Sequence, residues 1–202
     1  MLKFNEGRQA VLLARKSITH KLEEHDLATS DLDGVFLEKR GVFVTIHSTP
    51  GHLLRGCIGI PYPIITLKDA VIRAGQMVTT DPRFPPLTKN ELDTILVEVT
   101  ILTKPKLILN STPENILSSI EIGVHGLIVE FGQYSGLLLP QVPVEQGWNK
   151  EEFIANTCVK AGLPSDTWLE KDLKLYLFRG QIFSEIKPYG EIVEKTINGS
   201  DN

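Results

Sequence analysis

The run Ile95–Leu102 limits the possible folds of this chain more than any other segment. Nearly all of its residues are β-formers, and apolar and polar residues alternate poorly along it. This pattern is typical of a strand that is buried on both faces, which needs packed layers on each side of its sheet. The composition allows such layers, because 42% of the 202 residues are apolar and 23% are charged, as in globular proteins.

Hairpin signals indicate how the remaining strands pair. Residues 35–37 and 42–46 are β-branched and aromatic runs joined by a short link with a glycine, which predicts one hairpin. Gly132-Gln133-Tyr134-Ser135 predicts a second hairpin between two further apolar runs. Residues 53–60 and 173–186 predict additional strand regions. Hairpins of this kind favour an antiparallel or mixed sheet.

Helix signals fall between these strands. Residues 12–22 have apolar side chains near one face, and Thr66 with Asp69 forms a capping pattern at the start of a second helix. Thr112-Pro113-Glu114 starts a short helix, and residues 149–161 form a helix with Asn149 as its cap. Because strands and helices do not follow a strict βαβ rhythm, the expected fold class is α+β, an antiparallel sheet with helices packed on it.

Several classes of protein are disfavoured by composition. The longest apolar runs fall short of the roughly 20 residues of a membrane span, and the N-terminus lacks the layout of a signal peptide. The net charge of -4 opposes a general affinity for nucleic acid, although Lys104 and Lys106 leave a local basic surface as a further hypothesis. Cys57 and Cys158 are the two cysteines, and two free thiols suit a cytoplasmic protein. No known cofactor or metal motif occurs, so neither group is expected.

The segment Arg55-Gly56-Cys57-Ile58-Gly59 is the most unusual in chemical terms. Its two glycines, Gly56 and Gly59, allow a ligand to approach the backbone on both sides of Cys57. In a regular strand Arg55 and Cys57 would share a face, and the cation would favour the thiolate. Cys57 is therefore a candidate nucleophile or ligand contact. The alternative is a small buried residue, since free cysteine is often buried.

Four more residues are candidates, each with a structural alternative. Asp81 and Arg83 lie in the proline-rich loop 81–86, which suits a ligand site, but they could simply pair with each other. His125 precedes a strand and could act as a base or ligand, or as a hydrogen-bonded structural residue. Gln141 follows a proline stop and could present its amide to a ligand or satisfy loop backbone groups.

These segments together resemble the AMMECR family. Leu54-Arg55-Gly56-Cys57-Ile58-Gly59 is similar to the family signature. The other blocks of the family are matched in the same order by residues 81–86, 124–127, 136–142 and 147–163. Two departures stand out: Ile60 replaces the Thr or Ser that many members have, and His52 matches no fixed family position, whereas His125 does.

The resemblance implies a single AMMECR domain over residues 1–202, with two lobes and a cleft between them. A larger lobe would contain both termini, and a smaller lobe would be inserted into it. The signature is expected to act in the cleft. Prokaryotic members of the family are often encoded near, or fused with, Memo-like and radical-SAM proteins, which are therefore expected partners.

Two functions remain open from the sequence. The first is a binding or regulatory module that recognises a small ligand or partner through the cleft. Its ligand-binding residues would be Arg55, Gly56, Gly59, Asp81, Arg83 and Gln141. The alternative is a thiol-dependent enzyme in which Cys57 is the nucleophile and His125 or Asp81 handles protons.

Overall fold

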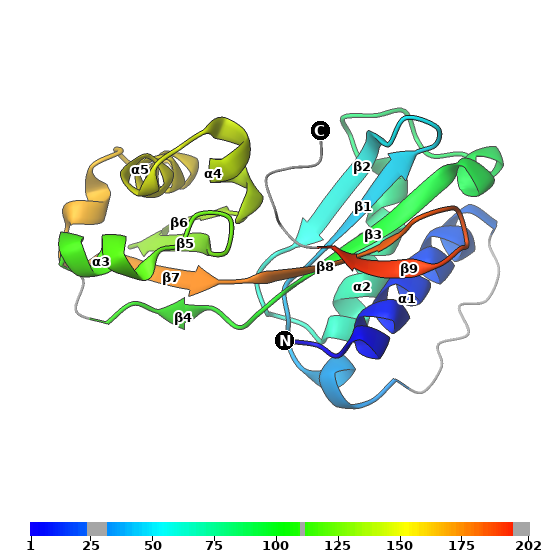
Figure 1. Cartoon of the computed structure of the whole chain (residues 1–202), viewed down its shortest axis with the longest axis horizontal. Coiled ribbons are helices and arrows are strands. Elements are labelled where there is room, and N and C mark those ends of the chain that lie inside the picture. The colour runs from blue at the N-terminus through cyan, green and yellow to red at the C-terminus, as the bar shows by residue number, and fades with distance from the viewer. Residues whose placement is uncertain (24–31, 110–111, 196–202) are drawn as a thin grey trace. The chain divides into compact units, whose positions relative to one another are not determined.

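The computed structural model describes residues 1–23, 32–109 and 112–195, and these fall into two compact units. The described residues of 1–102 and 181–195 form unit 1, and those of 103–180 form unit 2. Each unit has its own sheet and its own apolar core (Figure 1).

Unit 1 is a five-stranded sheet with two long helices. The strand order is β2-β1-β3-β8-β9, and β1 is antiparallel to both β2 and β3, as β8 is to β9. The elements are α1 (Phe4–Glu23), η1 (Gly34–Leu37), β1 (Val42–Ser48), β2 (Leu53–Ile60), α2 (Leu67–Met77), η2 (Val78–Thr80), η3 (Lys89–Thr94), β3 (Ile95–Leu102), β8 (Gly180–Glu185) and β9 (Ile192–Lys195).

The core of unit 1 lies between the sheet and the helices α1 and α2. Val42, Val44 and Ile46 alternate along β1 with less buried residues and join the apolar cluster that contains both helices. This period of two explains why one face of β1 is apolar. The prediction for β3 is confirmed, since every residue of this strand except Glu98 is buried.

The predicted hairpin over residues 35–46 is wrong. Residues 34–37 form the 3-10 helix η1, in which Phe36 is buried in the core and Leu37 is exposed. The true partner of β1 is β2, and the turn between them contains a cis Thr49–Pro50 bond and left-handed backbone at Gly51 and His52. The predicted cap of α2 is confirmed, since the Thr66 hydroxyl accepts a hydrogen bond from the Asp69 amide.

Unit 2 is a four-stranded sheet in the order β4-β7-β5-β6, with antiparallel pairs throughout. The elements are β4 (Lys106–Leu107), α3 (Pro113–Ser119), β5 (Gly126–Phe131), β6 (Tyr134–Leu138), α4 (Gln141–Gln146), α5 (Lys150–Lys160), η4 (Thr167–Leu169) and β7 (Lys174–Phe178). The helix α5 contacts β5 and β6 and contributes Phe153 and Ile154 to a second apolar cluster.

Most predictions for unit 2 are confirmed. The hairpin of β5 and β6 turns at Gly132-Gln133, and Asn149 forms a capping box with Glu152 at the start of α5. The predicted strand region 173–186 is two strands, β7 and β8, which belong to different sheets. Residues 141–146, which followed the predicted proline stop, form the short helix α4.

The α+β fold class is therefore confirmed. None of the helices in the described part of the chain combines the length and apolar character needed to cross a bilayer.

Candidate functional site

The backbone of Cys57 is held at the free edge of the sheet in unit 1. Since β2 is the outermost strand, the N–H and C=O of Cys57 that point away from β1 need partners outside the sheet. The Asp81 carboxylate accepts a hydrogen bond from the Cys57 amide at 2.8 Å, and the Arg83 guanidinium donates to the Cys57 carbonyl at 3.0 Å. Asp81 and Arg83 thus replace a neighbouring strand, and we call this arrangement the Cys57 clamp.

Asp81 is the fixed part of the clamp. Its side chain is buried, and its two oxygens also accept hydrogen bonds from the Arg83 amide, Nε and Nη2 at 2.7 to 3.1 Å. These bonds to Arg83, together with the Cys57 amide, hold the pKa of Asp81 well below its usual range. Asp81 therefore stays ionised near neutral pH and is poorly suited to transfer protons.

Arg83 is the exposed part of the clamp. Its guanidinium uses Nε and Nη2 for Asp81 and Cys57, and Nη1 has no hydrogen-bond partner among the described residues. The side chain is 56% exposed. The pKa of Arg83 is raised, first by its hydrogen bond to Asp81 and further by the charge of the Cys57 thiolate form. Arg83 is consequently a cation that lies beside the thiol.

Arg55 has a different environment from the one predicted. The pairing of β1 with β2 shifts by one residue between Ile46 and His47, which leaves Arg55 as the extra residue of a β-bulge. Its guanidinium donates to both Glu91 oxygens, at 2.8 and 3.2 Å, and to the carbonyls of Pro85 and Pro86. The regular alternation that would put Arg55 on the face of Cys57 is interrupted by this bulge. Arg55 instead anchors the proline-rich loop.

The Cys57 side chain is half-buried on the face of the sheet opposite the helices. Its sulfur accepts a hydrogen bond from the Thr45 hydroxyl at 3.3 Å, across the β1–β2 pair. The two glycines of the signature permit close contacts on opposite faces. A Cβ on Gly59 would lie 2.2 Å from the Phe43 ring, and one on Gly56 would lie 3.1 Å from the Val78 carbonyl oxygen.

Several residues next to Cys57 were missed from the sequence. Thr45 lies opposite both Cys57 and Glu98, and the Glu98 carboxylate pairs with Lys195 at 2.8 Å. The rings of His47 and His52 are in contact, with their centroids 4.2 Å apart, and the pKa of His47 is lowered mainly by burial. The signal was present in residues 42–48, where the aliphatic residues Val42, Val44 and Ile46 alternate with Phe43, Thr45 and His47.

The last two predicted site residues belong to unit 2. His125 accepts a hydrogen bond at Nδ1 from the Glu121 amide at 3.1 Å, and burial together with the charge of Arg179 lowers its pKa. Gln141 begins α4, and its Oε1 is buried with no hydrogen-bond partner in the part of the chain described. The structure thus groups Cys57, Asp81 and Arg83, but His125 and Gln141 lie in the other unit.

No group of three or more His, Cys, Asp or Glu side chains among the described residues is arranged to hold a metal ion.

Comparisons with known proteins give a consistent picture. The AMMECR1 family model matches residues 11–183. Protein MJ0810 of Methanocaldococcus jannaschii is 50% identical over 198 residues, which covers 98% of each chain. The crystal structure of an uncharacterized protein, PH0010 from Pyrococcus horikoshii, has 47% identity and a TM-score of 0.83 and covers 96% of this chain and 98% of its own.

Proposed function

The chain belongs to the AMMECR1 family, and we propose that it is a binding module that recognises an anionic group of a small ligand or partner protein at the Cys57 clamp. The observation that carries this proposal is the state of Arg83. Its guanidinium is fixed by a buried carboxylate, yet its Nη1 donors have no partner among the described residues.

An arginine held in this way is suited to binding. Two hydrogen bonds to Asp81 fix the plane of the guanidinium, so little side-chain freedom is left to lose when a ligand binds. Arginine presents paired donors that match a carboxylate or phosphate. Cys57, half-buried beside it, gives such a ligand a polarisable neighbour on the same sheet edge.

A thiol-dependent enzyme is the second candidate. It is favoured by the Thr45 hydroxyl, which donates to the Cys57 sulfur, and by the cation of Arg83 nearby. Binding is preferred for two reasons. Asp81, one of the two proposed proton carriers, is fixed as a carboxylate, and Arg55, the cation expected to favour the thiolate, is paired with Glu91.

The protein partners and the cellular location of this chain are each proposed from a single argument. Memo-like and radical-SAM proteins are proposed as protein partners from the family resemblance alone. A cytoplasmic location is proposed because Cys57 and Cys158 are both free thiols, which suits a reducing compartment.

Alkylation of Cys57 tests the role of Arg83. We expect anionic iodoacetate to react faster than neutral iodoacetamide, relative to a free thiol, because the guanidinium attracts the anion. In Arg83→Gln the ratio of the two rates should fall about fivefold, which corresponds to a charge roughly 4 Å away in water. Mass spectrometry of the Cys57 peptide gives both rates, and Cys158 contributes little because burial raises its pKa to about 11.

Binding is then read as protection of Cys57 from iodoacetamide. The competitors are inorganic phosphate, pyrophosphate, citrate and a purified Memo-like or radical-SAM protein. At least one should protect saturably in the wild type and in Arg73→Gln, which removes an exposed charge on α2, but not in Arg83→Gln. If none protects, or if Arg83→Gln is protected equally, the binding proposal is wrong. A covalent adduct of Cys57 in the intact mass would favour the enzyme.

A further inference from the structure

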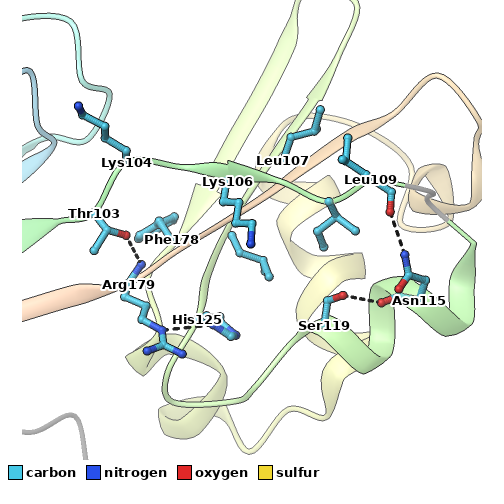
Figure 2. Close-up of a pocket in the computed structure, with 12 residues that line it drawn as sticks. Thr103, Lys104, Lys106, Leu107, Leu109, Asn115, Ser119, His125, Phe178 and Arg179 are labelled. Atoms are coloured by element: carbon cyan, nitrogen blue, oxygen red, sulfur yellow. Dashed lines mark hydrogen bonds between the residues drawn. The ribbon is translucent and has the colours of Figure 1, made fainter. Parts of the chain in front are cut away.

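Unit 2 contains a pocket that is separate from the Cys57 clamp. Its volume is about 720 Å³, and the described residues that line it lie between Thr103 and Arg179. Pockets of roughly 300–1,000 Å³ are typical of small-molecule sites. The pocket is bordered by β4, by the ends of α3 and β7, and by His125 (Figure 2).

The lining of this pocket is cationic although the whole chain has a net charge of -4. Lys104, Lys106 and Arg179 contribute to it, and none of its described lining residues is acidic. In Figure 2 the Lys106 side chain extends from β4 to the side on which His125 and Ser119 are drawn. The Lys104 side chain extends in the opposite direction. The backbone of Lys106 belongs to the β4–β7 pair, but its ammonium group makes no hydrogen bond or ion pair with any other described residue.

Arg179 has only a weak partner in this pocket. Its Nε lies 3.4 Å from Nε2 of His125, while Nδ1 of the same ring accepts a hydrogen bond from the Glu121 amide. A neutral imidazole has one N–H and one acceptor nitrogen, so it cannot accept from both donors. No carboxylate in the described chain pairs with Arg179, unlike Arg15, Arg55 and Arg83, which each have one. Its guanidinium is therefore available to an anion.

The remaining walls are apolar or neutral. Ile108 and Leu177 line the pocket on the same face of the sheet as Lys106, because Lys106 pairs with Leu177 and side chains alternate along each strand. Ser119 and Asn115 add a hydroxyl and an amide from α3 (Figure 2). A ligand that fits both parts has a charged head and an apolar body.

We propose that this pocket binds a small organic anion, with its carboxylate or phosphate between Lys106 and Arg179 and its apolar body against Ile108 and Leu177. This site is independent of the proposed function at the Cys57 clamp. A pocket of about 720 Å³ whose lining includes Lys106 and Arg179 suits a small molecule better than an extended nucleic acid strand, which needs a basic track along its backbone.

The test is a titration of the full-length, 15N-labelled protein with four probes, followed by NMR. The probes are phenyl phosphate, 3-phenylpropionate, benzyl alcohol and inorganic phosphate. At least one phenyl-bearing anion should shift the resonances of residues around Lys106, His125 and Arg179 saturably. The neutral alcohol and inorganic phosphate should each bind at least about tenfold more weakly, since each lacks one half of the recognised chemistry. Binding of only one of the two anions supports the proposal and identifies the head group.

Variants locate the binding. Lys106→Met and Arg179→Gln should each weaken the anion about tenfold, the effect expected for losing one charge-assisted hydrogen bond. Lys174→Met, which removes an exposed charge from β7 outside the pocket, should leave the affinity unchanged, and so should Arg83→Gln. The proposal is overturned if neither anion binds, if benzyl alcohol binds as well as the anions, if Lys174→Met has the effect of Lys106→Met, or if a ten-residue oligothymidine binds more tightly than phenyl phosphate.

Discussion

At the scale of single residues, the signature glycines act by leaving space. Gly59 lies opposite Phe43 in the β1–β2 pair, and the Phe43 ring occupies the place where a side chain of residue 59 would stand. Gly56 on the other face lies against Val78 in η2, where a Cβ would be 3.1 Å from both the Cγ2 atom and the carbonyl oxygen. A side chain at residue 59 would therefore collide with the Phe43 ring, whereas one at residue 56 would press on Val78.

This difference predicts how the effects of Gly59→Ala and Gly56→Ala on stability change when the Phe43 ring is removed. Gly59→Ala should lower the free energy of unfolding by about 1–3 kcal/mol, the usual cost of overpacking. Most of this loss should disappear in a Phe43→Ala background, because the colliding atoms belong to that ring. Gly56→Ala serves as the matched control, since its contact with Val78 remains. Urea denaturation of the single and double variants measures the coupling, and additive effects at residue 59 would contradict the prediction.

At the scale of elements, the Cys57 clamp joins two sequence blocks into one structure. Both blocks were found in the sequence, but their contact was not, because it depends on backbone groups of an edge strand. The sequence placed Arg55 on the face of Cys57 by regular alternation, and the bulge at Arg55 defeats that rule. It is Arg83 that lies beside the thiol, and pairing with Asp81 was weighed only as its structural alternative.

The strands and helices were predicted better than the site. The runs that became β3 and α5 carry strong local signals: a continuous set of β-formers and a capping box. Residues 35–37 have high β propensity but form a 3-10 helix with Phe36 in the core, since β propensity depends strongly on context. Cys57, Thr45 and Glu98 lie side by side on β2, β1 and β3 because of the register in which these strands pair. The sequence leaves that register undetermined.

The clamp also predicts a pH dependence. The folded-state pKa of Asp81 is lowered, so at acidic pH the unfolded chain binds more protons than the folded chain. The free energy of unfolding therefore rises with pH between the folded and the unfolded pKa of Asp81. The contribution of Asp81 is complete above its unfolded pKa of about 3.9 and is lost as the pH falls through the lower folded value. Asp81→Asn should therefore be less stable than the wild type by about 2 kcal/mol at pH 7, with a smaller difference at pH 3. Urea denaturation at both values tests this, and a constant difference would refute it.

At the scale of the whole molecule, the chain has two cores with no shared residue. Ile46 belongs to the cluster of unit 1, and Leu127 belongs to that of unit 2. The segment that forms unit 2 enters at Thr103 and leaves at Arg179, whose backbone groups are joined by a hydrogen bond of 2.8 Å. Unit 2 therefore brings its own ends together.

We expect the two cores to lose stability separately. Ile46→Ala and Leu127→Ala both remove fully buried side chains, and each should cost about 2–5 kcal/mol in its own unit. Native-state hydrogen exchange of the full chain reads each unit through its own amides. Ile46→Ala should speed the exchange of β1 and β3 and leave β5 unchanged, whereas Leu127→Ala should do the reverse. Residues 103–180 expressed alone should unfold cooperatively in urea, since their cluster is complete without unit 1. Equal acceleration in both sheets by either substitution would mean that the chain unfolds as one cooperative body.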